Sequence, residues 1–69
     1  MTNIADIKKD DLSRESYFGL LDLIEFHMAH YEMSISAYRA YRNPEYLEEA
    51  KYHLAKKYDA QNEASRREA

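Results

Sequence analysis

The segment from Tyr17 to Met28 constrains the fold more than any other part of this chain. Its large apolar residues would point in nearly every direction around a helix, so a single neighbouring helix could not cover them all. A chain of 69 residues hides only about 60% of the surface that its unfolded form exposes, so its hydrophobic core is small and its stability as a monomer is marginal. We therefore expect this segment to be covered by another chain together with the apolar residues before Ser13, namely Ile4, Ile7 and Leu12. The expected interface residues are Tyr17, Leu20, Leu21, Leu23, Ile24, Phe26 and Met28.

The composition predicts an all-α fold. The chain has one glycine, one proline and many residues that favour helices, such as alanine, leucine, glutamate and lysine. The proline marks a turn, because Asn43 is a good N-cap and Pro44 suits the first position of a helix. The residue before a proline avoids the α region, so the preceding helix should end near Arg42. The sequence thus predicts an antiparallel helical hairpin.

Capping residues give the expected boundaries. Ser13 is a favourable N-cap, which predicts a hairpin over residues 13–69, with helices over about 13–42 and 44–66 and the turn at residue 43. The end of the second helix has no apolar face, and we expect it to fray. Residues 1–12 form an N-terminal arm or a short helix, in which Asn3 or Thr2 could cap a turn that carries Ile4.

The first helix carries a heptad pattern of apolar residues. A second apolar row beside it makes the stripe wider than a contact between two helices needs. The residues of the second helix that would lie level with its beginning are the polar residues 61–66, which could not cover it. This pattern favours a helical-bundle homo-oligomer. The heptad residues are Tyr17, Leu21, Ile24, Met28, Tyr31, Ile35 and Tyr38.

Charge and composition exclude several classes of protein. A net charge of −3 argues against nucleic-acid binding, which needs a basic surface. The absence of cysteine excludes disulfides and thiolate zinc sites. The sequence shows neither a secretory signal nor an uninterrupted apolar stretch long enough to span a membrane. We therefore expect a cytoplasmic protein without a membrane segment.

No motif in the sequence indicates catalysis or a cofactor. There is no glycine-rich phosphate loop, no Gly-x-Ser-x-Gly elbow and no cysteine nucleophile. Ser34 and His30 could be neighbours on a helix, but a serine nucleophile also needs an oxyanion hole, which a chain with one glycine can hardly build. We expect no enzymatic activity.

Tyrosine and arginine gather at the predicted turn. Both residue types are enriched at the binding hot spots of protein interfaces, so this end is our candidate site for a protein partner. The alternative is helix-end chemistry, in which the arginines face the helix dipole and the tyrosines belong to the core. The candidate residues are Tyr38, Arg39, Tyr41, Arg42 and Tyr46.

Three hypotheses about function follow. The leading one is a non-enzymatic interaction protein that regulates or inhibits a larger macromolecule, like many small bacterial and phage accessory proteins. The second is an oligomer that holds a nucleotide or another anion with Arg39, Arg42, Lys51, Lys56 or Lys57. The third is a metal site of His27, His30 or His53 with Glu25, Glu32 or Glu49. The Glu-x-x-His pairs of helical di-metal proteins are missing, so we expect half-buried histidines and no bound metal.

Overall fold

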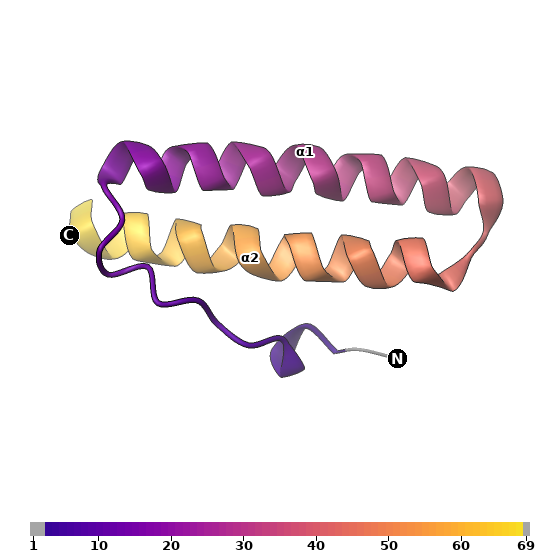
Figure 1. Ribbon diagram of the computed structural model, residues 1–69, viewed down its shortest axis with the longest axis horizontal. Coiled ribbons are helices and arrows are strands. Elements are labelled where there is room, and N and C mark those ends of the chain that lie inside the picture. Colours follow the sequence, from indigo (N-terminus) through magenta and orange to yellow (C-terminus); the bar gives the residue numbers. More distant parts are fainter. Residues whose placement is uncertain (1–2, 69) are drawn as a thin grey trace.

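The computed structural model describes residues 3–68, and these residues form helices and no strand (Figure 1). A short 3₁₀ helix, η1 (Ile4–Asp6), is followed by an extended arm and two long helices, α1 (Tyr17–Tyr41) and α2 (Pro44–Glu68). α1 and α2 lie side by side in opposite directions, and the arm runs back along α2 (Figure 1). The prediction of an all-α hairpin is confirmed. Asn3 caps η1 as expected, since its side-chain oxygen accepts a hydrogen bond from the Ala5 amide at 3.3 Å, whereas Thr2 lies outside the described residues.

α1 begins at Tyr17, later than Ser13 predicted. The actual N-cap is Ser16, whose hydroxyl oxygen accepts a hydrogen bond from the Gly19 amide at 2.9 Å. Ser13 is used differently, because its amide and its hydroxyl both donate to the Asp11 carboxylate, at 3.1 and 2.7 Å. Such local bonds from a side chain to the backbone compete with helix formation, so the Asp11–Ser13 turn keeps this segment out of α1.

The turn between α1 and α2 follows the local rules. Arg42 ends α1 in the left-handed region with φ 58°, and its amide donates to the carbonyl oxygen of Tyr38 at 2.7 Å. The side chain of Asn43 then accepts a hydrogen bond from the Glu45 amide at 3.0 Å. Pro44 is the first residue of α2. The predicted cap and the predicted helix start are both confirmed.

The hydrophobic core is small and contains mostly alanine. Leu20 is 0% exposed and packs against Ala60 and Ala64 of α2, with Leu12 of the arm beside it. The expectation that the end of α2 could not cover this segment is therefore wrong in part, because the two alanines let α2 approach closely and the arm adds an apolar side chain. Leu20 belongs to the interior of the hairpin, so it is not available to a second chain.

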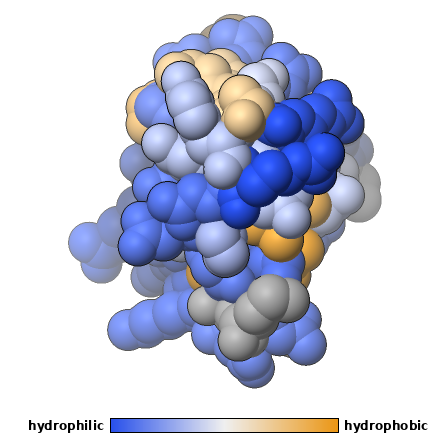
Figure 2. Space-filling view, turned by 90° about the vertical axis from the view of Figure 1, so that its right-hand side faces the viewer, coloured by the Kyte–Doolittle hydropathy of each residue, from blue (hydrophilic) through white to orange (hydrophobic). Residues whose placement is uncertain are grey.

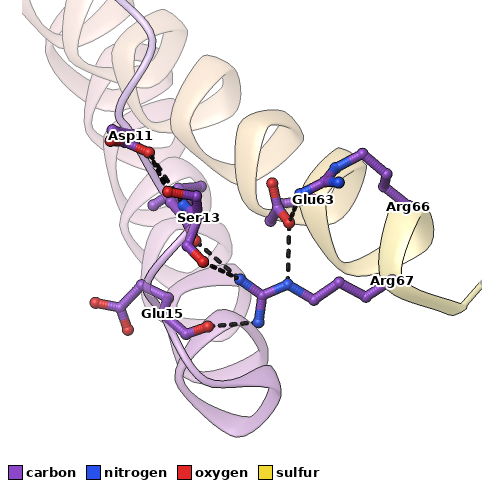
Figure 3. Close-up of polar contacts among 7 residues, drawn as sticks. Asp11, Ser13, Glu15, Glu63, Arg66 and Arg67 are labelled. Carbon is purple, nitrogen blue, oxygen red and sulfur yellow. Dashed lines mark hydrogen bonds and ion pairs between the residues drawn. The ribbon is translucent and has the colours of Figure 1, made fainter.

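α2 is helical as far as Glu68, slightly beyond the end that the sequence predicted at about residue 66. Arg67 donates to the carbonyl oxygens of Leu12 at 3.0 Å, Ser13 at 3.2 Å and Glu15 (Figure 3). Its Nε also donates to the carboxylate of Glu63 at 2.9 Å. One guanidinium thus joins α2 to the arm, and this contact between distant parts of the sequence explains why the helix continues.

A second cation fixes the arm further along α2. The Lys56 ammonium donates to the carbonyl oxygen of Lys8 at 2.6 Å and to the carboxylate of Asp10 at 3.0 Å. The Lys56 side chain is only 8% exposed. A buried ammonium is costly unless it is paired, so these two bonds make the arm an integral part of the fold.

Candidate functional site

One side of the hairpin carries a strip of apolar residues, which Lys51 and Gln61 interrupt on α2. Leu20, His27 and Ser34 point towards α2, and the residue after each of them lies about 100° further around the helix, on one side of the pair. The same rule applies to α2. Because the helices are antiparallel, the residue that comes one position after each α2 residue facing α1 lies on this same side of the pair. We call this surface the apolar flank. Its residues are Leu21, Ile24, Met28, Tyr31 and Ile35 of α1 and Leu47, Leu54 and Tyr58 of α2.

The apolar flank is only half covered. Leu21, Met28 and Tyr58 are classed as exposed, and the other members are partly buried. Of the interface residues expected from the sequence, Leu21, Ile24 and Met28 lie on this flank, with Tyr17 at the start of the same heptad row. Phe26 is exposed but lies elsewhere on α1, where its ring is tilted by 44° against that of His30 with 4.4 Å between ring centres. Leu23 packs against the core around Leu20.

The tyrosines and arginines of the candidate partner site come together at the turn, which Figure 2 views end-on as a mostly hydrophilic surface. The rings of Tyr41 and Tyr46 lie 6.0 Å apart, and the guanidinium carbon of Arg42 is 5.8 Å from the centre of the Tyr38 ring. Tyr41 is 74% exposed, whereas Tyr38 and Tyr46 are partly buried. Arg39, in the last turn of α1, is also exposed. We call these five residues the tyrosine–arginine end.

All three histidines of the chain meet between the helices. The Nδ1 atoms of His27 and His53 are 2.9 Å apart, and the ring of His30 stacks on that of His53 with 5.0 Å between centres. Burial is the main cause that lowers the pKa of His27 and of His53 below the usual value of 6.5. We call these residues the histidine cluster.

The sequence did not predict this cluster, because a hairpin that folds at residue 43 with the same register throughout would place His53 level with Ile35. A signal was present in the spacing of His27 and His30, which puts both on neighbouring parts of one helix face. Within residues 3–68, no three or more histidine, aspartate or glutamate side chains are arranged to hold a metal ion. The structure therefore adds no support to the metal hypothesis.

Two of the cations considered for an anion site are already engaged or covered. Lys56 binds the arm, and Lys57 is 8% exposed with its ammonium 4.8 Å from the centre of the Tyr58 ring. Arg39 and Arg42 lie at the tyrosine–arginine end, and Lys51 lies on the outer edge of α2. These cations do not converge on one open cavity, so the anion hypothesis gains no specific observation.

Comparison with known proteins finds no matching family model, no similar curated protein and no similar solved structure. In the part of the chain that the structure describes, neither helix combines the length and the apolar character that crossing a membrane would require.

Proposed function

We propose that this chain is a non-enzymatic interaction module, which self-associates through the apolar flank and binds a protein partner at the tyrosine–arginine end. The observation that carries the proposal is the contrast between a very small core and many exposed apolar side chains. Contiguous exposed apolar surface on a small protein marks an interaction site more often than scattered single residues do. In this proposal, binding regulates or inhibits the larger partner.

The core shows why the hairpin benefits from a partner. Among the described residues, the buried hydrophobic ones are a single leucine and four alanines, namely Leu20, Ala50, Ala55, Ala60 and Ala64. Full burial of one leucine contributes about 1.5–3 kcal/mol, and an alanine contributes much less. Covering the apolar flank would remove leucine, isoleucine and methionine side chains from water, so association would add stability that the single chain lacks.

The tyrosine–arginine end has the composition of a recognition surface. Tyr41 is almost fully exposed although it is a large aromatic residue, and two arginines stand beside it. Tyrosine and arginine contribute strongly at hot spots because they bury large areas and form directional hydrogen bonds. These features support a protein partner at this end of the hairpin.

Light scattering tests self-association. We expect a mass above 8.2 kDa at micromolar concentration and a fall in mass on dilution. A sharp mass of 8.2 kDa over about a hundredfold dilution, with cooperative unfolding retained, would show that the arm is sufficient cover and that the flank is not an interface.

Partner binding is tested at the other surface. A partner identified by affinity capture should lose binding to the Arg39→Ala/Arg42→Ala variant, because truncating a hot-spot arginine costs about 2 kcal/mol or more. Helix content and oligomer mass should stay unchanged. Normal binding by this variant would assign the arginines to helix-end chemistry and remove the partner site from this end.

A further inference from the structure

We infer that the apolar flank is covered by a second copy of this chain, with α1 of each copy lying against α2 of the other. The inference rests on the proposed function and names both the occupant of the flank and its orientation. The argument comes from the charges along the two edges of the flank, from the heights of these charges along the hairpin, and from the apolar residues between them.

The two edges of the flank carry opposite charges. Glu25 and Glu32 are exposed along the edge of α1, and before Arg39 that helix contains no lysine or arginine. The edge of α2 carries Lys51, whose side chain is partly exposed. A surface that is acidic along one edge and basic along the other is complementary to a second copy of itself when the acidic edge of each copy lies against the basic edge of the other.

The heights of Glu32 and Lys51 along the hairpin match. Met33 and Ser34 of α1 line the same cavity of about 200 Å³ as Glu49 of α2. Because the helices run in opposite directions, Glu32 and Lys51 then lie at nearly the same height. Neither residue forms an ion pair within residues 3–68, so both side chains are free to pair across an interface.

A twofold axis parallel to the helices joins these observations. Such an axis keeps every residue at its own height and places α1 of one copy on α2 of the other, so each Glu32 meets a Lys51. An axis perpendicular to the helices would set α1 against α1 and bring the acidic edges together. Like charges across an interface suppress that pairing, so the charges select the first arrangement.

Apolar contacts in the middle of the flank fit the same arrangement. His27 faces His53, which puts Met28 of α1 near the height of Leu54 of α2. Stacking α1 on α2 of the second copy brings Met28 of one chain against Leu54 of the other. The half-exposed residues of both helices are then buried together, and the charged edges remain at the rim of the interface.

Charge reversal tests the orientation. Glu32→Lys and Lys51→Glu should each raise the dissociation constant of the dimer by about three- to tenfold, since each change introduces two like-charged contacts per dimer. The double variant should return the constant to within about twofold of the unmodified chain, because opposite charges again face each other. Asp22→Lys is the matched control, because it makes the same change of charge on the outer side of α1 and should leave dimerisation unaltered.

The outcomes separate the orientation from the proposed function. If the unmodified chain dimerises but the double variant does not recover its dissociation constant, the crossed arrangement is overturned and self-association still stands. A chain that stays monomeric at every concentration would overturn both. Sedimentation velocity and circular dichroism on the same samples distinguish a lost interface from a lost fold.

Disulfide cross-linking provides an independent test, because the natural chain has no cysteine. A Met28→Cys chain mixed with a tagged Leu54→Cys chain should form a disulfide-linked pair when diamide is added as the oxidant. The Met28→Cys chain alone should form little, since the two Met28 positions are on diagonal helices. Efficient linkage of Met28→Cys to itself would show α1 against α1 and overturn the inference. Ala29→Cys, an exposed position seven residues after Asp22 on the outer side of α1, controls for random collision.

Discussion

The Nδ1 atom of His27 lies 2.9 Å from the Nδ1 atom of His53, across the middle of the contact between α1 and α2. A hydrogen bond between two imidazole nitrogens needs one N–H and one lone pair, so at least one of the two rings must be neutral. The ring of His30 stacks on that of His53, with 5.0 Å between ring centres. The packing of the two helices is therefore tied to the protonation of this cluster.

Stability should fall in mild acid. Burial is the largest cause that lowers the pKa of both rings. The pKa of His27 is lowered further by nearby His53, His30 and Lys56 and is raised by Asp10. The pKa of His53 is lowered further by His30 and is raised by Glu49. The folded chain therefore binds fewer protons than the unfolded chain, whose histidines titrate near 6.5. The contribution of the cluster is fully present above that pH and is lost as the pH falls through the folded pKa values.

Thermal melts between about pH 7.5 and about pH 5.5 measure this effect, because carboxylates titrate mostly below that range. The melting temperature should drop towards the acid end. In the His27→Gln/His53→Gln variant most of this dependence should disappear. An unmodified chain with a flat profile would show that the cluster accepts protons without cost to the fold.

Replacing Lys56 with alanine should release the arm from α2. The variant loses the bonds to the Lys8 carbonyl and to Asp10, and hydrogen bonds to a charged group contribute about 1.5–3 kcal/mol. Limited trypsin digestion should then cut faster after Lys8 and Lys9, and the melting temperature should fall. Arg14→Ala is the control, as that exposed side chain makes no contact of this kind. Equal cleavage rates in both variants would contradict a structural role for the buried ammonium.

Two neighbouring arginines at the end of α2 should behave differently. Arg67→Ala removes the donor shared by the carbonyl oxygens of Leu12, Ser13 and Glu15, and we expect a loss of about 1–3 kcal/mol with lower helix content. Arg66→Ala should change stability by less than about 0.5 kcal/mol, because among residues 3–68 its exposed side chain pairs with Glu63 alone, on the same helix. Denaturant unfolding followed by circular dichroism compares them. Similar losses in both would mean that the carbonyl contacts of Arg67 contribute nothing.

The turn gives a graded prediction. Asn43→Ala should cost about 1 kcal/mol, because the side-chain acceptor for the Glu45 amide is lost. Pro44→Ala should cost less, since alanine is also tolerated at the start of a helix and the change acts mainly on the unfolded chain. Chemical denaturation of both variants, with Ser36→Ala on the exposed face of α1 as a control, measures the difference. If neither changed the midpoint, the cap would have no role in setting the hairpin.

The features that the sequence predicted correctly depend on local rules. Asn43 and Pro44 define the turn through capping and through the restricted backbone before proline, and Asn3 caps η1 in the same way. The features that sequence reasoning missed depend on contacts between distant segments. Nothing near Arg67 in the sequence indicates that it will bind carbonyl oxygens of the arm. The apparent lack of cover for Leu20 likewise reflected a count of large residues, whereas small Ala60 and Ala64 cover it by allowing close approach.

The sequence did not predict the histidine cluster for a related reason. A constant register along the hairpin predicted Ile35 opposite His53, but the helices pair His53 with His27 and His30. The register depends on how side chains of both helices pack along their whole length, and residues near the turn do not determine it. The tyrosine–arginine end was easier to locate because it lies next to the turn, where few residues separate the two helices. Its role as a binding site remains a prediction, as does the interface along α1.

The turn at Asn43 and Pro44 also restricts how two copies of this chain can join. In domain exchange, a hairpin opens, its two helices merge into one long rod, and each rod completes its fold with half of another chain. That route requires helical backbone through Arg42 and Asn43, but the proline ring disfavours helical geometry at the residue before it. Exchange by this route is therefore opposed by the covalent structure of the turn, so the association that we propose would join intact hairpins.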